Sequence, residues 1–263
     1  MSKTFSNDKD KFSVDKENMK NNSISVALAY YQGGTFIKEQ LNSILKQLGE
    51  QDEVIISVDS AEDGSMGLLR SYAQGDSRIH LIRGPGKGVV KNFEHAIKRC
   101  RGEIIFLSDQ DDIWADDKVE KVLEAFRNPE LLCLVHDARI VNSEGDISED
   151  YTMFDWRKSG PGLAKNFVRN SYVGCCMAFR RKLVRRICPI PRSMYMHDFW
   201  IGMAAEMSGK VLFLPECLLY YRRHDDNITD MRHGTISFMI KKRANIIRCL
   251  RLLQRRVTEE ELR

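Results

Sequence analysis

In the amino-terminal half of the chain, short apolar runs alternate with segments whose apolar residues recur about every 3.6 positions. The short runs predict buried strands at residues 24–29, 53–58, 78–82 and 103–108. The periodic segments predict helices at residues 35–48, around residues 69–72 and at residues 90–100. Strands and helices in alternation are typical of an α/β fold with a doubly wound, mostly parallel sheet flanked by helices.

The carboxyl-terminal half follows a less regular pattern. Its apolar runs predict strands at residues 131–135, 172–179, 211–214 and 217–221. Helical periodicity predicts helices at residues 119–126, 163–169 and 196–207. We find no internal repeat and no low-complexity linker between the halves, and therefore expect one continuous domain.

Three carboxylates follow the apolar run at residues 103–108, namely Asp109, Asp111 and Asp112. Acids this close together repel one another, which favours a bound cation. Carboxylates without a cluster of Cys or His suit Mg²⁺ or Mn²⁺, with phosphate oxygens as further ligands. The alternative is a helix entrance, where Asp is also favoured. Right-handed crossovers would place Asp59 at the same sheet edge, where open α/β sheets bind ligands.

Length and composition fit a globular protein: 263 residues, of which 43% are hydrophobic, exclude a disordered or fibrous chain. There is no run of about 18 or more apolar residues, and residues 1–22 are polar, so we expect a disordered tail and a cytoplasmic protein. Seven cysteines without a CxxC pair argue against a disulfide framework and indicate a reducing compartment.

Basic residues are concentrated at the carboxyl terminus. Residues 235–263 hold eight Lys or Arg and three Glu, a charge of +5 against +4 for the whole chain, which leaves −1 for the remainder. Apolar residues recur there at helical spacing, predicting a basic amphipathic helical extension over residues 231–263. Such a helix lies on an anionic membrane surface near a lipid-linked acceptor, or packs on the domain or on a second subunit. The sequence slightly favours packing.

The order and spacing of several motifs resemble family 2 of the nucleotide-sugar glycosyltransferases, which have the GT-A fold. The resemblance extends from Ser23 to Asn227 and is closest to the bacterial rhamnosyltransferase-like branch that decorates surface polysaccharides. The matching segments are residues 26–31, 39–44, 57–59, 88–93, 108–114, 174–175, 197–200 and 221–224. The resemblance implies a GT-A domain at residues 23–230, with a nucleotide-binding half at 23–115 and an acceptor half at 116–230.

The resemblance also implies a reaction: inverting transfer of a sugar from a UDP- or dTDP-sugar to a hydroxyl of a glycan or lipid-linked acceptor. Asp198 would be the general base. The nucleotide would contact Ala29, Tyr31, Asp59, Lys87 and Asp109. The metal, Mg²⁺ or Mn²⁺, would bind Asp111, Asp112 and His224. The diphosphate and sugar would meet Lys91, Asn92, Arg222 and Arg223. The acceptor side would include Trp114, Gly174, His197 and Trp200.

Simpler interpretations remain open for several of these residues. Asp59 also fits a plain turn, Asp198 a helix cap, and residues 222–224 a solvated basic turn. The two tryptophans, at positions 114 and 200, also fit a core. His197 beside the base fits a structural role.

The sequence departs from the family at two places: Val58 replaces the first of two acids that relatives have after their second strand, and the turn at residues 224–227 is more acidic.

Three rival functions remain. One is a catalytically inactive homologue that only binds nucleotide. Another is a polyanion or membrane-surface binder that acts through the basic tail. The third, another metal-dependent nucleotidyl or phosphoryl transferase, is weakened because the loop at residues 84–88 lacks P-loop spacing. We expect no nucleic-acid partner, because the net positive charge is confined to the tail. A homodimer is left open.

Overall fold

The computed structural model describes residues 23–34, 36–223 and 236–261, with the side chains of the last helix described from residue 243 to residue 259. Within these ranges the strands are β1 (Ile24–Tyr31), β2 (Glu53–Ser60), β3 (Ile79–Arg83), β4 (Ile104–Ser108), β5 (Ile113–Trp114), β6 (Leu131–Val141), β7 (Ile147–Thr152), β8 (Met177–Arg180) and β9 (Lys210–Arg222). The longer helices are α1 (Phe36–Leu45), α2 (Met66–Gly75), α3 (Val89–Ile97), α4 (Lys118–Ala125), α8 (His197–Ser208) and α9 (Ile236–Glu261). The shorter ones are α5 (Met153–Arg157), α6 (Leu163–Val168), α7 (Val184–Ile187), η2 (Gly174–Cys176) and η3 (Arg181–Leu183). The expected disorder of residues 1–22 lies outside the described residues.

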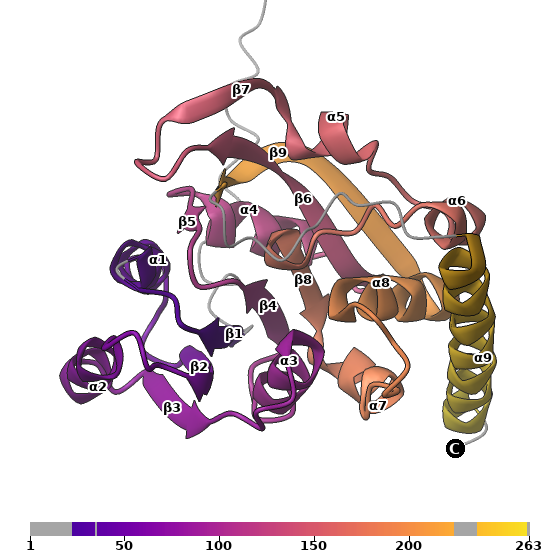
Figure 1. The fold of residues 1–263 in the computed structure, drawn as a ribbon, viewed down its shortest axis with the longest axis horizontal. Helices are drawn as coiled ribbons and strands as arrows, with labels where there is room; N and C mark the ends of the chain where they lie inside the picture. The colour runs from indigo at the N-terminus through magenta and orange to yellow at the C-terminus, as the bar shows by residue number, and fades with distance from the viewer. Residues whose placement is uncertain (1–22, 35, 224–235, 262–263) are drawn as a thin grey trace, which may run out of the picture.

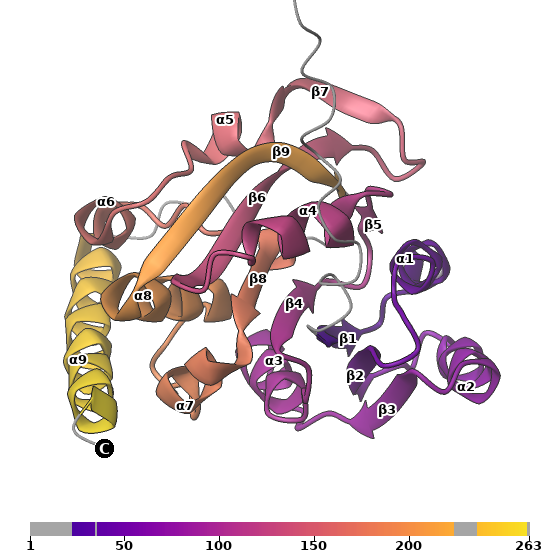
Figure 2. The ribbon, with the colours of Figure 1, turned by 180° about the vertical axis from the view of Figure 1, so that it is seen from behind.

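One sheet runs through the described molecule in the order β3-β2-β1-β4-β8-β6-β9-β5, with β7 paired to β6. Strands β3, β2, β1 and β4 are all parallel, so their carboxyl ends share one edge. Their side chains are almost entirely buried in β1, β2 and β4, which accounts for the continuous apolar runs of the sequence. Figures 1 and 2 show this half with α1 and α2 on the side far from α9. The predicted α/β sheet is confirmed here.

The second half differs from a simple parallel continuation. Strand β8 is antiparallel to both β4 and β6, and β5 is antiparallel to β9. The strand predicted at 172–179 is shorter, because Gly174–Cys176 forms a turn of 3₁₀ helix before β8 begins. A side chain at position 174 would approach His197 Nε2 to 2.8 Å, so this turn requires a glycine.

Two further predictions of strand extent were wrong. Strand β6 continues to Val141, beyond the predicted end at residue 135, because it pairs with β7 and β9 along its length. The runs at 211–214 and 217–221 form the single strand β9. Its register against β6 shifts where Pro215 lies, since His136 pairs with Leu214 and Asp137 with Cys217. A proline has no N–H to donate, so the strand bulges there rather than ending.

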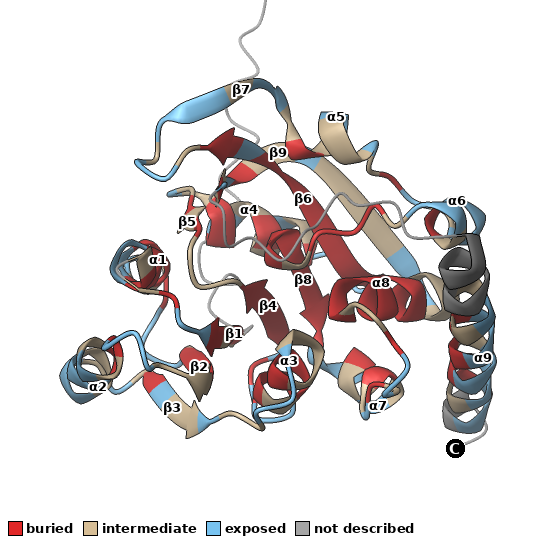
Figure 3. Ribbon diagram, in the orientation of Figure 1, coloured by how far each residue is buried: buried red, intermediate tan, exposed pale blue. Residues whose placement is uncertain are grey.

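Helix α9 is attached to the domain by one of its faces. Ile246, Cys249, Leu253 and Val257 are buried, and the helix packs beside α7 and α8. Arg256 donates to the carbonyls of Arg186 and Pro189 at 2.8 and 2.9 Å. Figure 3 shows the opposite side of α9 exposed. The sequence slightly favoured packing, on the domain or on a second subunit, and in the structure this face packs on the domain. No described helix has the length and apolar character needed to cross a membrane.

Candidate active site

Gln110, from the acidic loop after β4, joins that loop to the end of β1. Its side-chain oxygen accepts from Tyr31 N at 2.6 Å, and its nitrogen donates to Tyr31 O at 2.8 Å. These two hydrogen bonds continue the contact between β1 and β4 beyond the end of β4, through the side chain of Gln110. Gly33 leaves the necessary space, because a Cβ there would lie 2.8 Å from the Gln110 amide carbon. The contact joins the loop that carries Asp109 to the end of β1, where Ala29 and Tyr31 lie.

Asp59 lies at the end of β2 and is held by the glycine loop after β3. Its Oδ1 accepts from Gly86 N at 2.8 Å, and Gly84 N donates to Val58 O at 2.8 Å. A side chain at Gly84 would overlap Asp59 Oδ1 and lie 2.7 Å from the Asp59 backbone nitrogen. The glycine loop therefore positions the Asp59 carboxylate. The sequence had left open that Asp59 is only a turn residue, and this contact gives it a more specific structural setting.

Arg222, at the end of β9, is enclosed by the acidic loop. It is 1% exposed; its backbone N donates to Asp112 Oδ1 at 3.0 Å and its Nε to Asp111 O at 2.9 Å. Its guanidinium also contacts Glu39 and the carbonyl of Ser143. These donors hold the loop and Arg222 does not line the cavity, so its predicted contact with diphosphate stays a prediction.

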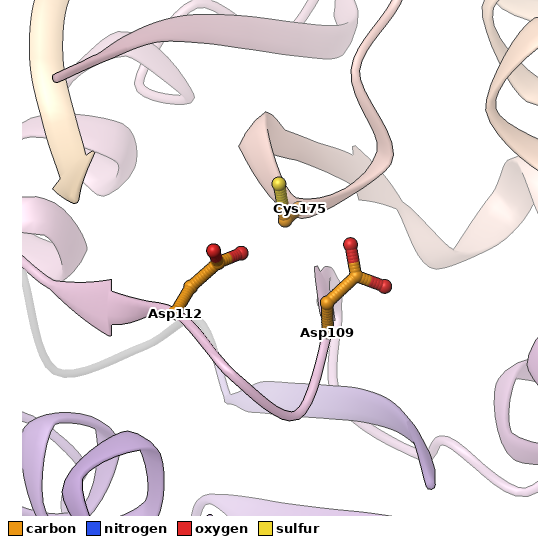
Figure 4. A group of neighbouring side chains, drawn as sticks. All are labelled: Asp109, Asp112 and Cys175. Atoms are coloured by element: carbon orange, nitrogen blue, oxygen red, sulfur yellow. The ribbon is translucent and has the colours of Figure 1, made fainter. Parts of the chain in front are cut away.

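Asp112 lies behind the loop, in a buried group with Asp109 and Cys175, and this differs from the expectation of a ligand beside Asp111 in the cavity. One ligand atom from each residue lies within 4.8 Å of the others, and Figure 4 shows their side chains facing one another. Burial raises the pKa of Asp112, and nearby Asp111 and Asp109 raise it further. Burial, followed by Asp111 and Asp198, raises the pKa of Asp109 to about 7.

A buried ammonium group accompanies these acids. Lys118 is fully buried, donates to Cys175 O at 3.0 Å and lies 4.1 Å from the centre of the Trp114 ring. Burial lowers its pKa to about 8, while Asp112 and Asp109 act in the opposite direction. This part of the site therefore contains a cation of its own on the buried side of the loop.

Asp198 and His197 begin α8 on the opposite wall. Asp198 is 4% exposed, and its Oδ1 accepts from Phe199 N at 2.5 Å. Burial raises the pKa of Asp198 to about 6, opposed by this hydrogen bond and by the positive charge of Arg157. His197 stacks on Phe93 with ring centres 3.9 Å apart, and burial lowers its pKa to about 3. The imidazole is therefore neutral at physiological pH.

A cavity of about 660 Å³ lies between these walls at the carboxyl edge of the parallel strands. Nine of the residues predicted from the sequence line it: Ala29, Tyr31, Asp59, Asn92, Asp109, Asp111, Gly174, His197 and Asp198. They come from β1, β2, α3, the loop after β4, η2 and α8. The fold therefore brings together positions as far apart in the sequence as Ala29 and Asp198.

The other predicted residues lie elsewhere. Trp114 and Trp200 are 1% and 0% exposed and belong to the core, where Trp200 Nε1 donates to Ile187 O at 2.8 Å. Lys91 contacts Glu94 and Ile190 O at 2.5 and 2.6 Å, outside the cavity lining. Lys87 is exposed on the glycine loop.

Two basic positions complete the set. Arg223 is held by Glu149 at 3.4 Å, and its guanidinium lies over the ring of Trp156 rather than in the cavity. His224 and the acidic turn that follows it lie outside the described residues.

The residues of the lining that sequence reasoning did not assign include two with polar side chains, Gln110 and Arg157. The position of Gln110 within the acidic motif gave a signal for it, since the loop begins at a strand end. Arg157 had none, because it follows an irregular stretch in which neither β7 nor α5 was predicted.

The carboxylates of the cavity fit a hard divalent cation. Asp111 lines the cavity beside Asp109; burial first and the negative charge of Asp111 second raise the pKa of Asp109, and a cation would oppose both. Oxygen donors open to a large cavity suit Mg²⁺ or Mn²⁺, which bind few protein carboxylates and share phosphate oxygens. The metal-facing role of Asp111 stays a prediction.

The fold is that of the GT-A glycosyltransferases. The fragment 1–349 of TarS from S. aureus, solved with UDP-GlcNAc, superposes with a TM-score of 0.64 at 17% identity, over 81% of this chain and 62% of that one. The mannosyltransferase PcManGT from Pyrobaculum calidifontis, solved with GDP-Man and Mn²⁺, gives a TM-score of 0.61 at 17% identity, over 78% and 58%. At this identity the likeness establishes the fold alone.

Residues 25–188 match the family described as Glycosyl transferase family 2, and the chain belongs to that family. The putative teichuronic acid biosynthesis glycosyltransferase TuaG of Bacillus subtilis is 34% identical over 212 residues, covering 78% of this chain and 81% of the relative. The dTDP-rhamnosyl transferase RfbG of Shigella flexneri is 25% identical over 236 residues, 84% and 79% of the two chains. An uncharacterized protein of Mycobacterium tuberculosis is 27% identical over 78% of this chain, which spans only 60% of that relative.

Proposed function

We propose that the protein transfers a sugar, with inversion, from a UDP- or dTDP-sugar to a hydroxyl of a glycan or lipid-linked acceptor. The observation that carries the proposal is the convergence of Asp59, Asp109, Asp111 and Asp198 on one cavity at the carboxyl edge of the parallel strands. Open α/β sheets bind nucleotides at this edge. The names of TuaG and RfbG support a role in bacterial surface polysaccharide biosynthesis.

The nucleotide end of the cavity lies between β1 and the glycine loop. The Asp59 carboxylate, oriented by Gly86 N, accepts the N3–H of a uracil or thymine base. The backbone at Ala29 and Tyr31 lies along the base, and Asp109 faces the ribose. Asp111 would hold the divalent metal, Mg²⁺ or Mn²⁺, which would supply positive charge beside the leaving diphosphate.

Asp198 takes the proton at the other end of the cavity. The acceptor oxygen forms a bond to the anomeric carbon while the bond from that carbon to the diphosphate breaks, and the hydroxyl proton passes to the Asp198 carboxylate. The attack comes from the face opposite the diphosphate, so the configuration inverts. Burial of Asp198 strengthens it as a base, because its ionised form is poorly solvated.

The first experiment is isothermal titration of the protein with UDP and with dTDP, with and without Mn²⁺. We expect metal-dependent binding, weakened about tenfold or more in Asp111→Ala, the factor that corresponds to ~1.4 kcal/mol. The matched control is Asp116→Ala. This acid is exposed, lies outside the cavity lining and pairs with Lys46. No binding of either nucleotide by folded wild type would refute the proposal. Binding without any transfer or hydrolysis of a sugar donor would instead indicate an inactive homologue.

A further inference from the structure

Within the described part of the chain, Arg157 is the one Lys or Arg side chain that lines the cavity. The charged groups around it are carboxylates, with Asp198 among them. Of the basic residues that the sequence suggested for this role, Lys91, Arg222 and Arg223 contact other groups, Lys87 is exposed outside the cavity lining, and His224 lies outside the described residues. A cation at this position therefore supplies a binding property that the acidic lining lacks.

Helix α5 holds Arg157 in a defined place. The helix begins with a capping box, in which Thr152 and Asp155 bond each other's backbone, and it ends at Lys158 in the left-handed conformation. Phe154 fixes it to the sheet, because its N donates to Asp137 Oδ1 at 2.8 Å and its ring contacts Phe213. The side chain thus projects from a pinned turn rather than from a free loop.

The guanidinium has unused donors. It stacks over the Trp156 ring at 5.1 Å, a contact that leaves the N–H edge available. Its Nε is shielded from solvent and has no hydrogen-bond partner among the described residues. No described carboxylate lies within ion-pair distance, so Arg157 is not neutralised by Asp198. A buried donor without an acceptor is costly, and an oxyanion in the cavity would remove that cost.

The acceptor end of the cavity is the place where this cation acts. Burial raises the pKa of Asp198 and of Tyr195, which precedes α8, and the positive charge of Arg157 acts in the opposite direction on both. The cation that acts on Asp109 is the buried Lys118 instead. The electrostatic influence of Arg157 is therefore exerted on the proposed base, Asp198, and not on Asp109 in the loop that would hold the diphosphate.

We propose that Arg157 binds an acidic group of the acceptor glycan, a carboxylate or a phosphate, beside Asp198. The assignment to the acceptor rests on the proposed function, whereas the binding of an oxyanion does not. The planar guanidinium matches either oxyanion with two parallel hydrogen bonds. An acidic acceptor would be selected over a neutral one, and its hydroxyl would be oriented toward the base.

The test compares small acidic probes with neutral analogues by saturation-transfer NMR, in Mg²⁺ with and without UDP. The pairs are glucuronate against glucose, and glycerol phosphate against glycerol. We expect wild type to prefer one acidic member, and Arg157→Gln to lose that preference by about tenfold or more. Arg157→Lys should retain part of the preference, because the positive charge remains while the paired donors of the planar guanidinium are lost. Preferred binding of glucuronate identifies the group as a carboxylate, and preferred binding of glycerol phosphate identifies it as a phosphate.

Lys158→Gln is the matched control, since it removes the same charge one residue away at an exposed position outside the cavity lining. It should leave the preference unchanged. Equal binding of acidic and neutral probes by wild type, or an unchanged preference in Arg157→Gln, overturns the inference. A loss of UDP affinity in Arg157→Gln with the probe preference intact assigns the guanidinium to the donor and overturns it as well. Failure of wild type to bind nucleotide refutes the proposed function separately, because the probes are also tested without UDP.

Discussion

At the scale of single residues, burial decides which carboxylate suits which role. Asp198 is 4% exposed, with its pKa raised to about 6, so it can take a proton near neutral pH. Asp59, fixed by Gly86 N at the partly exposed end of β2, faces the cavity as an acceptor of hydrogen bonds. The two acids therefore differ in environment, although both follow apolar segments in the sequence.

Replacing Asp198 by Asn should lower kcat by a factor on the order of 10² to 10⁴, because a general base would be lost. Nucleotide affinity should stay the same, since the nucleotide lies at the other end of the cavity. In wild type, kcat should fall as the pH decreases through about 6, where the carboxylate becomes protonated. Steady-state rates across the pH range check this, with titration of UDP as the binding control. A rate that is independent of pH between 5 and 7, about one unit on either side of that pKa, would assign the base elsewhere.

Gly84→Ala should weaken nucleotide binding and destabilise the fold by about 1–3 kcal/mol, because the added methyl group would press on Asp59 from two sides. Gly67→Ala, in α2, is the control, since no atom lies within 4 Å of the added Cβ. That variant should be neutral or more stable, because alanine favours a helix interior by up to ~1 kcal/mol. Chemical denaturation and UDP titration measure both effects. Equal behaviour of the two variants would contradict the role given to the Gly84–Asp59 contact.

At the scale of elements, the sequence predicted best where a strand is buried on both faces. The runs at 53–58 and 103–108 match β2 and β4 closely, because unbroken apolar residues are needed between two helical layers. The extent of β9 was not predictable in the same way, since Pro215 looks like a strand end and is tolerated only by the register shift against β6. Long-range pairing decided the outcome there.

The site shows the same limit. Asp109 and Asp111 could be found because a strand end and a carboxylate cluster coincide in the sequence. Arg222 was assigned to the diphosphate because an Arg after an apolar strand suggests phosphate binding, yet its donors hold Asp111, Asp112 and Glu39. Only the packing of β9 against the acidic loop distinguishes these two uses of one side chain.

Helix α9 leads to a prediction about membranes. Arg248, Arg251 and Arg255 form an exposed ridge opposite its buried face, and Ile247 and Leu252 are 42% and 38% exposed on either side. We propose that this ridge contacts an anionic membrane surface, where each Arg contributes about 1 kcal/mol. The protein should sediment with vesicles that contain phosphatidylglycerol, and less so at high salt. The triple substitution of the ridge arginines by Gln should abolish this.

The control for the ridge removes the same charge from exposed positions outside α9. Lys38, Arg70 and Arg127 are exposed on α1, α2 and the end of α4, and their replacement by Gln should leave vesicle binding unchanged. Equal loss in both triple variants would indicate a general charge effect and not a membrane-facing helix. Binding to an oligonucleotide as strong as binding to vesicles would favour the polyanion interpretation instead.

At the scale of the whole molecule, the continuous sheet joins the two halves into one unit. Strand β8 pairs with both β4 and β6, so the nucleotide-binding half and the acceptor half share a core. The cavity uses both halves, with Asp59 and Asp111 on one side and Asp198 on the other. We therefore propose that the predicted boundary near residue 115 separates functional regions of one domain, not two folding units.

The two halves should accordingly unfold together. Trp114 and Trp200 are buried in different halves, so tryptophan fluorescence and far-UV circular dichroism should report coincident thermal transitions. UDP with Mn²⁺ should shift both transitions upward by the same amount, because a ligand that binds only the folded state stabilises the whole cooperative unit. In Asp111→Ala the shift should shrink while the transition stays single. Two separate transitions, with only one raised by the nucleotide, would show that the halves fold independently and that the shared strand β8 does not couple them.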